Sequence, residues 1–276
     1  MSDLAPMPHG SYSFVSAVTG RGQENGKMKK SLFVLAALLV MSSFASAAIS
    51  YPGQIVGVNV IYSNFSEESG TDPGVALYGA PSYGGGDSVA FDDLFFSAYA
   101  EGDLGTDTTD GTLFGTVAAK PNHAVDTIKF EEFGDFNLTG FQNNAFVSVT
   151  NTIFIKVKEI DFVNVEDFTF EVDMVMTPSD GDWLLTEGGY PQYQGDWSGT
   201  LFVDVTQAII DAGLTGVATD VDFTMDNTLS ALSQAGTTAF IAKKETNGLK
   251  VTTLDVPEPA TLALLGLGGL LLRRKK

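Results

Sequence analysis

Short strand-like segments follow one another along the middle of this chain, with no long helical pattern between them. They are rich in Val, Ile, Phe and Thr, and clusters of Gly, Asn, Asp and Pro separate them. In FTFEVDMVM (168–176), apolar residues occupy every second position, and only Val175 breaks the alternation. The segments are 55–62, 112–119, 126–133, 146–160, 168–176, 200–205, 218–225, 237–244 and 249–254.

So many strands without intervening helices exclude βαβ units and leave an antiparallel sandwich or barrel. We therefore predict an all-β fold, a jelly-roll-like antiparallel β-sandwich over residues 48–255. Long loops are expected at 63–74, 79–90, 100–111 and 178–199. Helical turns fit only 206–212 and 229–235, apart from a signal helix and a short transmembrane helix at the two ends.

The segment MKKSLFVLAALLVMSSFASAA (28–48) has the three parts of a secretory signal peptide. Two lysines follow Met28, an apolar stretch runs from Leu32 to Met41, and small residues precede Ala47 and Ala48. We predict a signal peptide at 28–47, cleaved after Ala47, with Ala48 as the neighbouring alternative.

Residues 1–27 lie ahead of that signal and show no apolar periodicity. A signal peptide normally begins a chain. Either translation starts at Met28 and these residues reflect a start-site error, or they extend the basic region of the signal. We favour the start-site error and expect this leader to be disordered and absent from the mature protein.

The charge distribution excludes nucleic acid as a partner. The chain carries a formal net charge of -19, and between residues 48 and 255 only seven lysines face 31 acidic residues. Such a surface repels phosphate backbones. The chain has no cysteine, which also excludes disulfides, thiolate metal sites and a cysteine nucleophile.

Catalytic signatures are missing from the sequence. His123 lies in KPNHAVD, a turn before a strand, and no G-x-S-x-G or H-E-x-x-H pattern accompanies it. Glu131 and Glu132 are adjacent on a predicted strand, so they face opposite sides of the sheet and cannot flank one bond. We expect a protein that is not an enzyme.

One acidic segment is a candidate calcium site. EGDLGTDTTDGT (101–112) places Asp103, Asp107 and Asp110 in a predicted Gly-rich loop, and Ca²⁺ prefers such oxygen ligands. The spacing is not that of an EF-hand. The alternative is a solvated acidic loop, and we expect no other cofactor.

A second candidate is the aromatic segment WLLTEGGYPQYQGDW (183–197). Trp183, Tyr190, Tyr193 and Trp197 could stack on sugar rings if they pointed outward together. Aromatic residues also fill sandwich cores, and Trp183 precedes two leucines. We favour core packing.

The last residues, VPEPATLALLGLGGLLLRRKK (256–276), combine three features. Pro257, Glu258 and Pro259 form an extended segment, a largely apolar stretch of 13 residues follows from Ala260 to Leu272, and four cations end the chain. As a helix the apolar run spans roughly 20 Å, less than the roughly 30 Å hydrocarbon core. We expect a marginal membrane segment with its cations on the cytoplasmic side.

This tail resembles the PEP-CTERM protein-sorting signal of Gram-negative bacteria, with Pro257, Glu258 and Pro259 as the motif. The resemblance implies recognition and cleavage by an exosortase, a membrane protease, and release or attachment at the cell surface. Signals of this family often occur in bacteria that make exopolysaccharide. The leader at 1–27 is not part of the family pattern.

Two classes of function remain. The first is a non-enzymatic component of the cell surface or extracellular matrix, with extracellular polysaccharide as a possible partner. The second is a carbohydrate-binding, lectin-like module or, less favoured, a glycan-active hydrolase with its site built across loops. A cleft with paired carboxyl groups on facing strands would favour the hydrolase.

Overall fold

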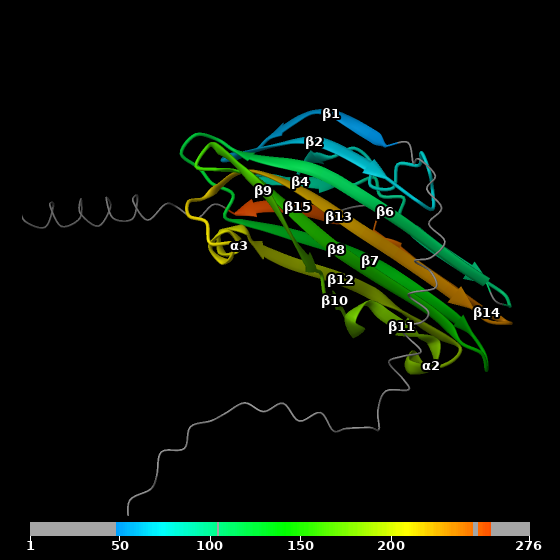
Figure 1. The fold of residues 1–276 in the computed structure, drawn as a ribbon. Coiled ribbons are helices and arrows are strands. Elements are labelled where there is room, and N and C mark those ends of the chain that lie inside the picture. Colours follow the sequence, from blue (N-terminus) through cyan, green and yellow to red (C-terminus); the bar gives the residue numbers. More distant parts are fainter. Residues whose placement is uncertain (1–47, 104, 245–247, 255–276) are drawn as a thin grey trace, which may run out of the picture. The chain divides into compact units, whose positions relative to one another are not determined.

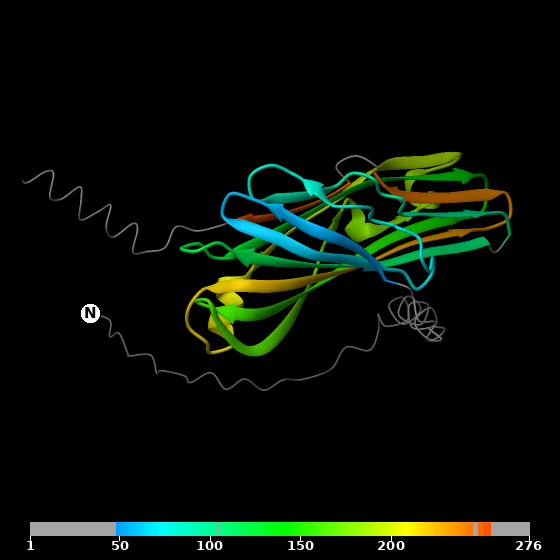
Figure 2. The same cartoon turned by 90° about the horizontal axis from the view of Figure 1, so that it is seen from above.

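The structure is a computed structural model that describes residues 48–103, 105–244 and 248–254. These residues form two antiparallel β-sheets that pack face to face as a sandwich (Figure 1 and Figure 2). The predicted all-β sandwich is therefore confirmed. The leader, the signal peptide and the PEP-containing tail lie outside the described residues. Among the helices within them, none is long and apolar enough to cross a membrane.

Sheet A has seven strands within the described part of the chain. Its main path runs β1, β2, β6, β13, β8, and both β9 and β11 pair with β8. The bounds are β1 (Ile49–Val56), β2 (Val60–Glu68), β6 (Gly105–Ala119), β8 (Ala145–Ile160), β9 (Val163–Asp173), β11 (Asp182–Leu184) and β13 (Ala218–Ser233).

Sheet B has eight strands among the residues described. Its main path runs β10, β12, β7, β15, β4, β3, and β14 pairs with both β7 and β5. The bounds are β3 (Ser82–Tyr83), β4 (Ser88–Phe91), β5 (Ser97–Glu101), β7 (Thr127–Gly140), β10 (Met176–Thr177), β12 (Gln192–Asp204), β14 (Thr237–Lys243) and β15 (Leu249–Leu254).

In the part of the chain that the structure describes, three short helical segments connect strands: η1 (Ser179–Gly181), α2 (Leu185–Gly188) and α3 (Val205–Asp211). The last confirms the helical turn expected at 206–212, and the carboxylate of Asp204 caps it by accepting a hydrogen bond from Gln207 N at 2.7 Å. The turn considered at 229–235 was wrong, because residues up to Ser233 belong to β13.

Alternation along the strands builds the core between the sheets. In β7 the even-numbered positions from Ile128 to Leu138 face inward and the odd-numbered positions face outward. The same alternation in β9 turns Phe168, Phe170 and Val172 toward the core, as the pattern predicted, while Val175 just beyond the strand is exposed. Each sheet therefore presents one polar outer face.

Several predicted boundaries were wrong. The loop expected at 100–111 is mostly the start of β6, and the loop expected at 178–199 contains β11 and the first half of β12. The single strand expected at 55–62 is the end of β1, a turn and the beginning of β2. The edge strand β1 also has a register shift between Tyr51 and Gln54, where Gly53 has a φ of 118°.

Candidate functional site

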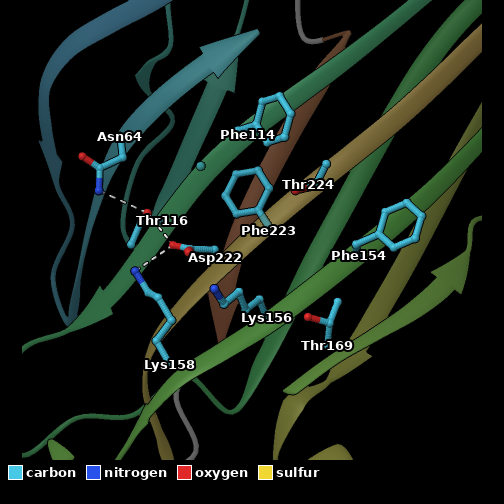
Figure 3. A pocket seen from close by; sticks show the side chains of 11 residues that line it. Asn64, Phe114, Thr116, Phe154, Lys156, Lys158, Thr169, Asp222, Phe223 and Thr224 are labelled. Atoms are coloured by element: carbon cyan, nitrogen blue, oxygen red, sulfur yellow. Dashed lines mark hydrogen bonds and ion pairs between the residues drawn. The ribbon is translucent and has the colours of Figure 1, made fainter. Parts of the chain in front are cut away.

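An open groove lies on the outer face of sheet A, across β2, β6, β13, β8 and β9 (Figure 3). Its volume is about 440 Å³, within the usual size of small-ligand sites. The outward residues that line it are Asn64, Phe114, Thr116, Phe154, Lys156, Lys158, Thr169, Asp222 and Thr224. We call this the outer groove.

Strand register places two aromatic side chains on either side of a threonine. Thr224 of β13 pairs with Phe114 of β6 on one side and with Phe154 of β8 on the other. All three side chains point outward and are partly exposed. The row therefore offers two apolar rings with a small polar side chain between them.

The next row along the strands is polar. Asp222 pairs with Thr116 and with Lys156, and Lys156 pairs in turn with Thr169 on β9. Hydroxyl, carboxylate and ammonium groups thus lie side by side along one wall of the groove (Figure 3).

Hydrogen bonds hold this polar wall together. Asn64 Nδ2 donates to Thr116 Oγ1 at 3.3 Å, and the Thr116 hydroxyl donates to Asp222 Oδ1 at 2.7 Å. Asn64 has a φ of 56° beside the register shift of β2, which brings its amide over the groove. The Lys158 ammonium lies 2.8 Å from Asp222 and 3.0 Å from Asp220.

Lys158 is held in its charged form by these contacts. Burial alone lowers its pKa, but the hydrogen bonds to Asp222 and Asp220 outweigh burial, and the net shift is upward. Lys156 and Lys158 of the groove are balanced in formal charge by Asp222 in its lining and by Asp220, which pairs with Lys158 beside it. The groove is therefore locally neutral within a strongly acidic domain.

A second polar cluster lies inside the sandwich and is closed to solvent. Lys243 of β14 lies 2.5 Å from Glu132 Oε1 of β7, and Asn227 Nδ2 of β13 donates to the same oxygen at 3.0 Å. The Lys243 ammonium also lies over the rings of Tyr78 and Phe96, at 5.2 and 4.8 Å from their centroids. Because this core cluster is buried, it serves packing between the sheets and not ligand binding from solvent.

The three predicted calcium ligands are not brought together as a loop site. Asp107 and Asp110 lie in β6, three residues apart, so they point to opposite faces of the strand. Asp103 lies in the turn before β6, and the Asp107 carboxylate accepts a hydrogen bond from Tyr99 N at 2.8 Å. Within the described residues no group of three or more His, Cys, Asp or Glu side chains could hold a metal ion.

The four aromatic residues of 183–197 do not form an outward cluster. Trp183 and Trp197 are buried in the core, and Tyr193 packs edge-on against Phe136. Only Tyr190 is exposed, at 42% of its surface. Trp183, Tyr193 and Trp197 therefore pack the sandwich, which is the alternative favoured from the sequence, and Tyr190 does not.

The candidate catalytic residues are also separated. His123 lies in the connection before β7, where its backbone N–H closes a turn on Lys120 O. Glu131 faces outward and pairs with Lys129 at 2.6 Å, whereas Glu132 faces the core, as expected for neighbours on a strand.

The sequence reasoning missed the outer groove. The available signal was weak: Phe114 and Phe154 are apolar residues at outward positions of strands whose other outward positions are largely polar. A single sequence does not reveal that both pair with Thr224.

One family model matches the chain, at residues 255–276, and it describes the PEP-CTERM protein-sorting motif. This segment is a PEP-CTERM motif. The resemblance found in the sequence is thereby confirmed, and it covers only the end of the chain. A PEP-CTERM motif marks an exported protein that an exosortase sorts at the cell envelope.

No curated protein matches this chain. Among solved structures, TmCBM61 in complex with β-1,4-galactotriose is 12% identical over 55% of this chain and 70% of that chain, with a TM-score of 0.15. The family 11 xylanase from Neocallimastix patriciarum is 9% identical over 75% of this chain and 100% of that chain, with a TM-score of 0.19. The infectious bursal disease virus VP2 subviral particle is 10% identical over 83% of this chain and 68% of that chain, with a TM-score of 0.13. Likenesses at these scores assign neither ligand nor activity to this chain.

Proposed function

We propose that this protein is a non-enzymatic component of the cell surface or extracellular matrix of a bacterium with a Gram-negative-type envelope. The observation that carries this function is the PEP-CTERM motif at residues 255–276. The acidic domain is suited to this location, because a large net charge of one sign keeps a protein hydrated and soluble.

A structural role without catalysis is supported by where the titratable candidates lie. Glu132 is engaged inside the core by Lys243 and Asn227, and Glu131 faces the opposite side of β7. In the outer groove, Asp222 is hydrogen-bonded by Thr116 and paired with Lys158. These carboxylates are thus already engaged by neighbouring side chains.

Processing of the tail tests this proposal. In a host with an exosortase, the mature surface protein should lack Leu262 to Lys276. Changing Pro257, Glu258 and Pro259 together to alanine should leave the full-length chain in the membrane fraction. Deleting the exosortase gene provides the matched control, because it should give the wild-type chain the same fate. Mass spectrometry that finds only intact Lys276 in the wild-type surface protein would contradict the proposal.

Carbohydrate binding is a second candidate, and the outer groove is the observation that favours it. Sugar rings present apolar C–H faces to aromatic side chains and hydroxyl groups to polar ones. The groove supplies both kinds of contact, through the Phe114, Thr224 and Phe154 row and the neighbouring polar row.

A glycan array tests the second candidate. The wild-type domain should bind at least one glycan, and Phe154→Ala should weaken that binding. Phe202→Ala is the matched control, because Phe202 is 57% exposed on the outer face of the other sheet. Equal losses from the two variants would place the binding surface elsewhere.

A further inference from the structure

We infer that the outer groove takes a neutral glycan chain at least two pyranose rings long, laid across β6, β13 and β8 from Phe114 to Phe154. This inference rests on the second proposed function, carbohydrate binding, and specifies the class of ligand.

The length follows from strand register. Phe114 and Phe154 pair with the same residue, Thr224, from opposite sides. They are therefore two strand spacings apart, roughly 10 Å. A single pyranose ring cannot contact both side chains over that distance, whereas two linked rings can, with their junction above the small Thr224 side chain.

The polar row is placed to meet the hydroxyl groups of such a chain. Asp222 lies two residues before Thr224 on β13, so the two rows are roughly 7 Å apart along the strands. A ring stacked on Phe154 thus has its edge toward Lys156, and a ring on Phe114 has its edge toward Thr116. Thr169 on β9 adds a hydroxyl at the margin of the groove.

Charge decides between neutral and acidic sugars. Lys156 and Lys158 are matched in number by Asp220 and Asp222, and Lys158 is already bound to both aspartates. The rest of the domain carries a large excess of carboxylates. An acidic polysaccharide would meet repulsion from the domain, and Asp222 in the groove together with Asp220 beside it offsets the charge of both lysines. A neutral glycan meets no such repulsion.

Titration calorimetry with defined sugars tests the inference on the protein released by signal and tail processing. The neutral probes are cellohexaose, xylohexaose, mannohexaose and β-1,4-galactohexaose, and the acidic probes are hexagalacturonate and a hyaluronan hexasaccharide. We expect binding of at least one neutral hexasaccharide, with its monosaccharide at least roughly tenfold weaker. Phe114→Ala and Phe154→Ala should each weaken binding roughly tenfold, and Phe202→Ala should leave it unchanged.

A further variant guards against loss of folding. Thr169→Glu changes an exposed position at the margin of the groove, so the sandwich should melt at the wild-type temperature while affinity falls roughly tenfold. Unchanged affinity in this variant and in both phenylalanine variants would overturn the placement in the groove.

The remaining outcomes separate this inference from the function on which it rests. Tighter binding of the acidic hexasaccharides would retain carbohydrate binding and overturn the neutral-chain inference. Equal affinity for a monosaccharide and its hexasaccharide would overturn the two-ring length. Absence of binding to these probes and to a glycan array would overturn both the inference and the carbohydrate-binding candidate.

Discussion

Lys243 and Glu132 put an ion pair into the middle of an apolar core. Burial lowers the pKa of Lys243, and attraction to Glu132 opposes that shift. The glutamate is also bound by Asn227, while its second oxygen, Oε2, has no hydrogen-bond partner among the residues that the structure describes. The pair is therefore costly to bury and still more costly to break.

Removing one partner should be strongly destabilising. Lys243→Met is expected to lower the free energy of unfolding by about 3–5 kcal/mol, because Glu132 would keep an uncompensated buried charge. The double variant with Glu132→Gln should recover most of that loss, since glutamine is neutral and still accepts a hydrogen bond from Asn227. Urea denaturation at pH 7 measures the free energy of unfolding of the single and the double variant. A single variant as unstable as the double variant would contradict the argument.

Asp110 makes stability depend on pH in the opposite sense from most carboxylates. Burial, and then the charges of Asp226 and Glu68, raise its pKa from 3.8 to about 6. Between these values the folded state binds more protons than the unfolded state, so Asp110 lowers stability as pH rises from about 4 to above 6.

The variant Asp110→Asn should therefore be more stable than the wild type at pH 7 and equal to it near pH 4. We expect a gain of about 1 kcal/mol at most, because the group is partly exposed and screened by solvent. Urea denaturation of both proteins at pH 4 and pH 7 measures this gain in stability. As a control, Asp226→Asn should lower the pKa of Asp110 in an NMR titration, and an unchanged pKa would show that Asp226 does not act on it.

The pairing of strands β7 and β12 depends on a glycine opposite a tryptophan. Gly134 pairs directly with Trp197, and a Cβ on Gly134 would lie 2.1 Å from the indole and 2.2 Å from Ala242 O. The tryptophan ring thus covers the backbone of the facing strand. This contact ties β12 to the centre of sheet B.

Gly134→Ala should accordingly destabilise the sandwich by about 1–3 kcal/mol, the usual cost of overpacking. Gly195→Ala on β12 is the matched control, because its Cβ would come no closer than 3.2 Å to Phe136 and should cost less. Thermal unfolding compares the two. A larger loss from Gly195→Ala would contradict this account of the pairing.

The alternation of apolar and polar residues was sufficient to predict most strands, because each strand buries one of its faces. It failed in the first half of β12, where QYQGDWSG lacks β-branched residues and forms a strand through its pairing with β7. It also could not find the outer groove. Phe114 and Phe154 are far apart in sequence, and only the order of strands in sheet A makes them neighbours of Thr224. Register between distant strands is not encoded in local periodicity.

For the whole protein, we expect export to depend on the two ends of the chain. We expect the mature N-terminus at Ala48, or within a residue or two of it, because small residues precede this position after the apolar stretch. The first strand of sheet A begins at Ile49, so this cleavage would leave every strand of the sandwich intact. N-terminal sequencing of the surface protein measures it. Recovery of a chain that starts at Ser2 would contradict the predicted signal peptide.

The register shift in β1 has a consequence for proteins displayed at high density. β1 is the outermost strand of sheet A on its side, and its shift lies at Pro52 and Gly53. Pro52 has no N–H to donate, and the bulge bends the strand away from a regular ladder. A strand from a neighbouring molecule therefore finds no continuous edge to extend. At the β1 edge, crowded copies are thereby hindered from joining their sheets.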